Sequence, residues 1–172
     1  MHGETSPFQN VPDWVDRLGK PSDTKPIRWQ SNGRSPYISL ATDVVHALLM
    51  RPGLTIDQLL TLLPGSRFTR VQDIVLTMEK LGAMERTDGR LALTHGVRPP
   101  VHALHPVAYQ IQKLLLGGQV LDGSQVTTLL PALTGGSFNS RRSQVTRCCQ
   151  CLCALSVLQH TVRNKRMHFY AE

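Results

Sequence analysis

Apolar residues from Leu40 onward recur at the three- and four-residue spacing of an amphipathic helix, and Pro52-Gly53 ends that run. Thr55 then offers the side-chain oxygen of an N-cap for a second, short helix over residues 56–63. Pro64-Gly65 cannot continue a helix and ends it. The pattern therefore predicts two consecutive helices separated by a tight turn.

A third helix and a β-hairpin follow in the sequence. Thr69 opens the helix, apolar residues between Val71 and Leu81 form its buried stripe, and Gly82 is its C-cap candidate. Residues 84–93 then alternate around Asp88-Gly89, a dipeptide that suits the left-handed turn of a two-residue hairpin. The order is thus helix, helix, turn, helix, hairpin.

The rest of the chain repeats this order. Residues 58–64 match residues 125–131 at five of seven positions, an offset of 67, and for the third helix the offset becomes 74. A seven-residue insertion around Gly135-Gly136 accounts for the difference, and residues 157–170 read as a second hairpin that turns at Asn164-Lys165. The aligned apolar positions are Ala41 with Ala108, Val44 with Ile111, Leu48 with Leu115, Leu49 with Leu116, Val71 with Val145, Ile74 with Cys148, Val75 with Cys149, Met78 with Leu152, Leu81 with Leu155, and Met84 with Leu158.

In element order, residues 37–172 resemble the winged-helix superfamily, a helix-turn-helix variant. The expected fold is mainly α with small β-hairpins (α+β): tandem winged-helix domains preceded by an extended N-terminal arm. We place the arm at residues 1–36, the first unit at 37–97, a linker at 98–103 and the second unit at 104–172. The resemblance implies that a third helix enters the DNA major groove while the hairpin wing contacts the flanking backbone.

The predicted arm is rich in proline and has no sustained periodicity, which indicates an extended segment. Trp14 and Trp29 are unusual in a plain linker. They either anchor the arm on the neighbouring domain or bind a partner.

Composition changes this picture in two ways. An apolar share of 41% supports a packed core, while the lack of a long apolar run or a signal-like N-terminus predicts an intracellular protein without membrane association. The formal charge of +7 indicates a polyanionic partner, and it is unevenly placed. Residues 37–97 carry six basic and six acidic side chains, whereas residues 104–172 carry seven basic and two acidic ones.

The excess charge falls on the third helix and the hairpin of the second unit. With Val145 turned inward, the outer helix face is polar, and one face of the hairpin is basic. Arg and Gln can contact base edges, and Ser, Thr and Arg can contact phosphates. The predicted nucleic-acid contacts are Arg141, Arg142, Ser143, Gln144, Thr146, Arg147, Gln150, Arg163, Lys165 and Arg166.

The equivalent surface of the first unit differs, because Asp73 and Leu76 face outward on its third helix. A carboxylate disfavours phosphates, and an exposed leucine suggests a protein contact. We therefore expect this unit to be auxiliary, in dimerisation, partner binding or weaker DNA contact. Its candidate residues are Arg67, Arg70, Gln72, Leu76, Arg86 and Arg90.

The four cysteines all lie between Cys148 and Cys153. On a helix these thiols spread around the circumference, whereas zinc needs converging ligands, usually from two separated pairs. We expect Cys148 and Cys149 to be small core residues and Cys151 and Cys153 to be partly exposed, with a redox-sensing thiol beside Arg147 as an alternative. No metal, cofactor or catalytic constellation is predicted.

The sequence thus predicts a non-enzymatic, sequence-specific DNA-binding protein, a transcription regulator acting as a homodimer or with a partner protein through its first unit or its arm. Two alternatives stay open. Tandem winged helices also serve as protein-interaction modules in assembly subunits, and the same basic surface suits RNA.

Overall fold

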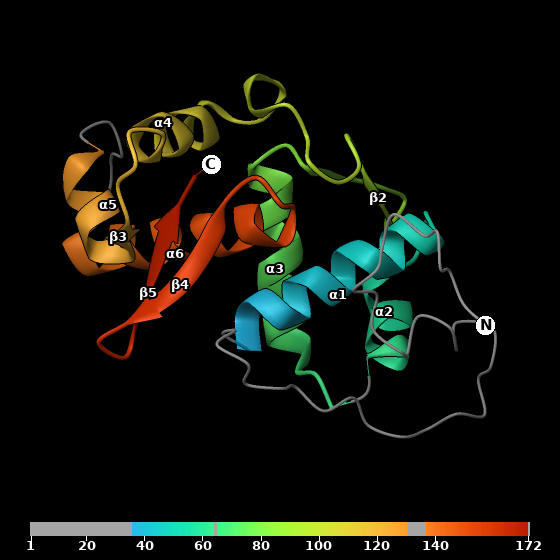
Figure 1. Ribbon diagram of the computed structural model, residues 1–172. Helices are drawn as coiled ribbons and strands as arrows, with labels where there is room; N and C mark the ends of the chain where they lie inside the picture. The colour runs from blue at the N-terminus through green and yellow to red at the C-terminus, as the bar shows by residue number, and fades with distance from the viewer. Residues whose placement is uncertain (1–35, 64, 131–136, 172) are drawn as a thin grey trace, which may run out of the picture.

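The computed structural model describes residues 36–63, 65–130 and 137–171. The predicted arm, apart from Pro36, lies outside these residues, together with Trp14 and Trp29. The insertion around Gly135-Gly136 lies outside them as well. Within the described part the protein is α+β, mainly helical with two small antiparallel sheets (Figure 1).

The elements follow the predicted order. In the first half they are α1 (Pro36–Met50), α2 (Ile56–Leu62), α3 (Phe68–Lys80), β1 (Met84–Thr87) and β2 (Arg90–Leu93). In the second half they are the 3₁₀ turn η2 (Val101–Ala103), α4 (Pro106–Leu115), β3 (Leu121–Asp122), α5 (Gly123–Leu129), α6 (Phe138–Ala154), β4 (Gln159–Arg163) and β5 (Arg166–Tyr170).

Both short helices begin with the same local device. The Gln58 N–H donates to the Thr55 hydroxyl oxygen and the Thr55 N–H donates to Gln58 Oε1, which makes a capping box at the start of α2. Asp122 and Gln125 form the same box at α5, with the same offset of 67 residues. A capping box satisfies two backbone N–H groups that a helix start would otherwise leave unpaired, so each short helix has a defined first residue.

Both hairpins turn at the predicted dipeptides. Asp88 and Gly89 have φ of 52° and 78°, and Asn164 and Lys165 have φ of 52° and 62°. Two consecutive left-handed residues match the twist of the flanking strands. In the second half β3 adds a third strand, in the order β3-β5-β4, with Leu121 opposite Phe169. The equivalent position in the first half, Leu54, forms an isolated bridge to Leu91.

Burial repeats along the aligned helices. The predicted inward positions of the first and third helices are buried in both halves, except that Cys148 and Leu49 are partly exposed and Leu116 is exposed. The buried pairs are Ala41 with Ala108, Val44 with Ile111, Leu48 with Leu115, Val71 with Val145, Val75 with Cys149, Met78 with Leu152, Leu81 with Leu155, and Met84 with Leu158.

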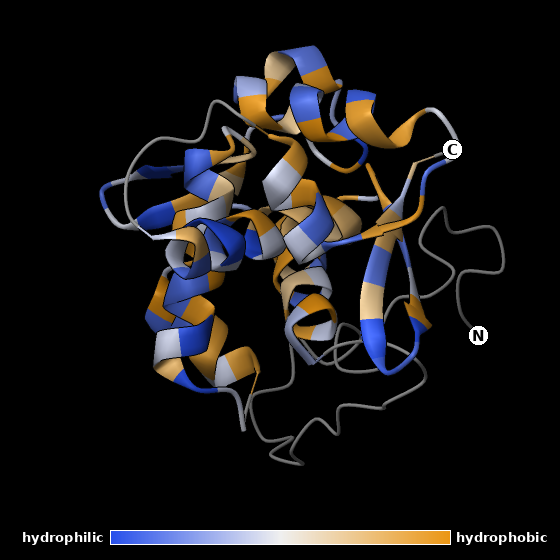
Figure 2. Cartoon of the chain, turned by 90° about the vertical axis from the view of Figure 1, so that its left-hand side faces the viewer, coloured by the Kyte–Doolittle hydropathy of each residue, from blue (hydrophilic) through white to orange (hydrophobic). Residues whose placement is uncertain are grey.

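The two halves share one continuous hydrophobic core. α6 packs on both α1 and α3, and in Figure 1 α1 runs across α3, with α2 on one side of α3 and α6 with its sheet on the other. In Figure 2 each helix carries alternating hydrophobic and hydrophilic stripes, as expected where only one face is buried. The third helices of the two halves are therefore neighbours.

The segment between the two halves forms backbone hydrogen bonds with the C-terminal ends of α3 and α6. The His105 N–H donates to the Leu81 carbonyl after α3, and the Arg98 N–H donates to the Leu155 carbonyl after α6, each at 2.8 Å. These bonds satisfy helix-end carbonyls that would otherwise lack partners. The segment from Arg98 to His105 thus connects the C-terminal ends of α3 and α6. Among the described helices, none is both long and apolar enough to cross a membrane.

Candidate nucleic-acid interface

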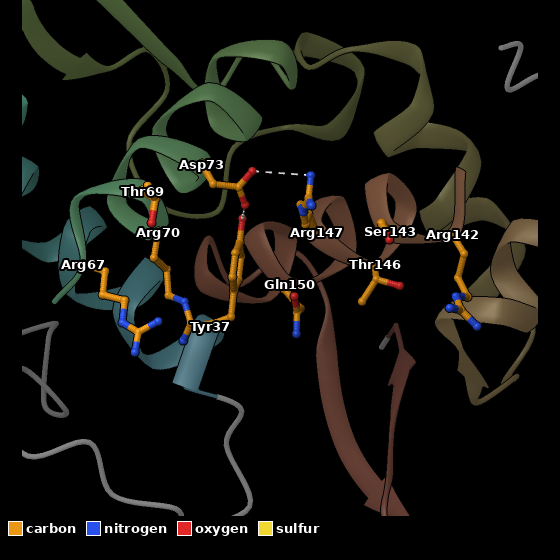
Figure 3. A pocket seen from close by; sticks show the side chains of 10 residues that line it. All are labelled: Tyr37, Arg67, Thr69, Arg70, Asp73, Arg142, Ser143, Thr146, Arg147 and Gln150. Carbon is orange, nitrogen blue, oxygen red and sulfur yellow. Dashed lines mark hydrogen bonds and ion pairs between the residues drawn. The ribbon is translucent and has the colours of Figure 1, made fainter. Parts of the chain in front are cut away.

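A polar groove of about 500 Å³ lies between the first half of α3 and the middle of α6, and Tyr37 at the start of α1 also lines it (Figure 3). Its lining residues are Tyr37, Arg67, Thr69, Arg70, Asp73, Arg142, Ser143, Thr146, Arg147 and Gln150. The groove exists because the shared core turns the polar faces of the two third helices toward a common space.

The groove is strongly basic. Arg67, just before α3, and Arg70 in α3 line one side, and Arg142 and Arg147 of α6 line the other, against the single lining carboxylate of Asp73. Like charges gathered along a low-dielectric wall focus the electrostatic potential and attract ligands of opposite sign. A smaller hollow of about 250 Å³ shares Arg67 and Arg70 and extends the basic surface along the start of α3.

Asp73 connects the three helices around the groove. The Tyr37 hydroxyl donates to Asp73 Oδ2 at 3.0 Å, and Arg147 Nη1 lies 3.4 Å from Asp73 Oδ1 (Figure 3). Burial raises the pKa of Tyr37 well above its usual value, and the nearby Cys151 and Asp73 raise it further. The phenol therefore stays protonated and remains a donor. The side chains of Arg147 and Asp73 are 46% and 32% exposed, so water screens their ion pair.

Most of the predicted α6 residues meet in the groove. Arg142, Ser143, Thr146, Arg147 and Gln150 line it.

Two predicted α6 residues lie outside the lining. Arg141 stacks at 5.9 Å over the ring of Phe138, and Gln144 is exposed. The polar face predicted from helical spacing is thus split between the groove and the neighbouring surface.

The candidate residues of the first half divide in the same way. Arg67 and Arg70 join the groove, so the surfaces expected for the two units are continuous here. Gln72 and Leu76 are exposed outside the lining, and Leu76 remains 45% accessible.

The hairpin arginines of the first half have local partners. Arg86 pairs with Glu79 at 2.9 Å, and Arg90 donates to the Gly53 carbonyl at 3.3 Å. Each keeps an exposed position on or beside the hairpin, but neither lines the groove.

The second hairpin has the predicted register. Arg163 lies opposite Arg166 and Thr161 opposite His168, on the face away from Phe169. Arg163, Lys165 and Arg166 are all exposed, and Arg166 lies 3.7 Å from the carboxylate of Asp122 at the start of α5. These cations form a second basic surface outside the groove.

The prediction for the cysteines is wrong for Cys151. This residue is fully buried, with its sulfur 3.9 Å from the Tyr37 hydroxyl, because α6 packs on α1 along that side. Cys149 is buried and Cys153 is partly exposed, as expected. The prediction is also wrong for Cys148, which was expected in the core and is partly exposed. Within the part of the chain that the structure describes, no three His, Cys, Asp or Glu residues gather as a metal site would require.

Sequence reasoning missed Tyr37 and Thr69 as groove residues and did not anticipate the partners of Asp73. Tyr37 precedes the apolar run of α1 and has no periodic signal, so only the packing of α1 against α6 brings it to the groove. An outward Asp73 was predicted correctly by angle, but its ion pair depends on a helix 74 residues away in sequence.

Comparison with known proteins identifies no relative: the chain matches no family model, no curated protein and no solved structure. Its function is therefore inferred from the groove and the elements around it.

Proposed function

We propose that the protein is a non-enzymatic, sequence-specific DNA-binding protein, a transcription regulator of two tandem winged-helix units. The observation that carries this proposal is the convergence of four arginines from α3 and α6 on one groove. Phosphate backbones supply most of the affinity of such complexes, and clustered arginines release the condensed counterions.

The winged-helix assignment is supported by the repeated element order. Each half runs helix, short capped helix, third helix and two-stranded hairpin, and each adds a bridge or strand just before its short helix. In that family the third helix and the wing contact DNA together. Here the corresponding elements are α3 and α6 with their hairpins.

The lining of the groove suits recognition better than catalysis. Arg147 and Gln150 can make paired hydrogen bonds to base edges, while Ser143 and Thr146 suit phosphates or bases. Among the described lining residues there is one carboxylate and no histidine or cysteine. Such a set offers donors for a polyanion and no evident acid–base pair.

An assembly subunit is the second candidate, favoured by apolar side chains left on the surface. Leu76 on α3 is exposed, and Tyr109 and Leu116 lie two turns apart on one face of α4 at 50% and 54% exposure. These residues could also serve the homodimer or partner contact that we propose for the DNA-binding protein. RNA binding is the third candidate, since the same cations contact either backbone.

The test is a binding titration of the full chain against a random-sequence DNA duplex at several salt concentrations. Arg70→Ala and Arg142→Ala each remove one groove cation from opposite sides, and Arg51→Ala removes an exposed cation outside it. We expect each groove variant to weaken binding and to flatten the log–log salt slope by about 0.9, whereas Arg51→Ala changes neither.

Three outcomes would oppose the proposal. The absence of duplex binding by the wild type at low salt favours the assembly subunit. Equal losses in all three variants indicate general charge attraction without a groove. Tighter binding to an RNA of the same sequence, with the same dependence on Arg70 and Arg142, would show that the groove binds RNA in preference to DNA.

A further inference from the structure

Asp73 is the one negatively charged side chain among the described residues that line the groove. It lies where α3 and α6 approach each other, and its two oxygens are engaged by different helices. Oδ2 accepts from the Tyr37 hydroxyl of α1, and Oδ1 pairs with Arg147 of α6. The carboxylate is thus held in place within a surface otherwise suited to phosphate.

A fixed carboxylate in such a groove has two electrostatic consequences. It occupies Arg147, whose guanidinium would otherwise be free to meet a phosphate or a base edge. It also repels any phosphate that comes near Arg147. Both consequences reduce the affinity for phosphate backbones of any sequence.

We infer that Asp73 is a specificity-determining residue, which competes with nucleic-acid phosphates for Arg147 and so lowers non-specific binding. This inference rests on the proposed function of the groove. A ligand that offers Arg147 a well-placed base edge displaces the carboxylate, and a ligand that offers only backbone phosphates does not. Specificity is a difference between affinities, and a built-in penalty against the wrong ligand increases that difference.

Tyr37 supports this role by limiting the motion of the carboxylate. Its hydroxyl stays protonated because it is largely buried, so the hydrogen bond to Asp73 is present at neutral pH. An unanchored aspartate could rotate away from an incoming phosphate at little cost. The anchored one stays beside Arg147.

The test compares Asp73→Asn with Asp57→Asn in the full chain. Both substitutions remove one negative charge, and Asp57 is exposed on α2, outside the groove lining and both hairpins. Asn at position 73 can still accept from the Tyr37 hydroxyl, so the scaffold is kept. Asp73→Ala is a second neutral variant that keeps a strong helix former.

We expect both Asp73 variants to bind a random-sequence DNA duplex about threefold to thirtyfold more tightly than wild type, with a steeper salt slope. Affinity for a selected binding site should rise less, so the ratio of specific to non-specific affinity should fall. Asp57→Asn should leave that ratio unchanged. Melting curves of the variants confirm that the fold is retained.

The outcomes separate this inference from the proposed function. If wild type binds DNA but neither Asp73 variant binds more tightly than Asp57→Asn, the inference is wrong and the proposed function stands. If no variant and no wild type binds nucleic acid at low salt, both fail. An equal gain for the specific and random duplexes would also overturn the role in specificity.

Discussion

Burial keeps the thiols of α6 protonated. Cys149 and Cys151 have no exposed surface, and burial raises the pKa of both thiols. At the less enclosed Cys148, burial raises the pKa to about 11, although Lys80 and Arg147 partly oppose the shift. The sequence left open a redox-sensing role for a thiol beside Arg147. In the fold desolvation outweighs the neighbouring cations, and the thiolate needed for such chemistry is disfavoured.

These pKa shifts predict a loss of stability at alkaline pH. Unfolded thiols ionise near pH 8.5 while the folded ones remain protonated, so the contribution is complete below that pH and falls as pH rises toward the folded pKa. For Cys148 that window ends near pH 11. We expect urea unfolding between pH 7 and about 9.5 to show a falling free energy of unfolding, by at most about 1.4 kcal/mol per pH unit and thiol.

The Cys148→Ala variant is compared with wild type, because it lacks one buried thiol and keeps all the other titrating groups of the protein. Its free energy of unfolding should fall less steeply with pH than that of wild type. Parallel curves, or rapid labelling of all four thiols by iodoacetamide in the folded protein at pH 8, would contradict the assignment.

At the scale of elements, the first turn of α5 meets the middle of α6. Gly123, the first residue of α5, lies directly against Thr146 of α6. A Cβ built on Gly123 would collide with the Thr146 hydroxyl and lie 3.3 Å from its Cβ. Glycine is thus required here by a close approach, since its backbone does not have a positive φ. The contact also fixes Thr146, which lines the groove.

Gly123→Ala is therefore expected to destabilise the fold by about 1–3 kcal/mol through overpacking. In an exposed helix the same change would instead stabilise by about 0.5–1 kcal/mol. Removing the obstacle with Thr146→Ala should recover most of the loss, which a double-mutant cycle by chemical denaturation measures.

Gly117→Ala is the matched control, since nothing lies within 4 Å of its added Cβ. It should change stability little. If Gly123→Ala behaves like Gly117→Ala, the two helices are not in the close contact described.

Local signals in the sequence predicted the elements well. These signals act over a few residues: Thr55 caps a helix, Pro52-Gly53 ends one, and Asp88-Gly89 forms a turn. The helices and hairpins accordingly begin and end within a few residues of the predicted positions. Each weak sequence signal was supported by the apolar residue at the aligned position of the other half. In the structure, burial repeats at most of these aligned positions.

The site was less predictable for a physical reason. Helical spacing shows which side of α6 is polar, but it does not show what that side faces. Arg147 was expected at the centre of a free outer face, and it instead faces Asp73 across the groove. Such a pairing depends on the packing of α1 and α3 against α6, which no short segment encodes.

At the scale of the whole molecule, the shared core determines how two third helices can meet DNA. Their side chains touch, with 3.4 Å between Arg147 and Asp73. A major groove is about 12 Å wide and accepts one helix of about 10–12 Å diameter. The recognition helices of a dimer that reads two half-sites lie about 34 Å apart. α3 and α6 match neither case as two separate readers. If the protein binds DNA as we propose, one helix lies in the major groove while the other contacts phosphates at its rim.

A single chain should accordingly protect one continuous stretch of DNA, about one helical turn of 10–10.5 base pairs, and not two stretches separated by a turn. Hydroxyl-radical footprinting on a selected site, at protein concentrations where the chain is monomeric, measures this. Arg70→Ala and Arg142→Ala should each reduce protection within the same stretch, because both arginines line one groove. A second protected stretch should arise only with a second chain, as the proposed homodimer requires. Two separated stretches from one chain would mean that α3 and α6 part on binding. That would break the core they share and the bonds from His105 and Arg98 that tie their ends.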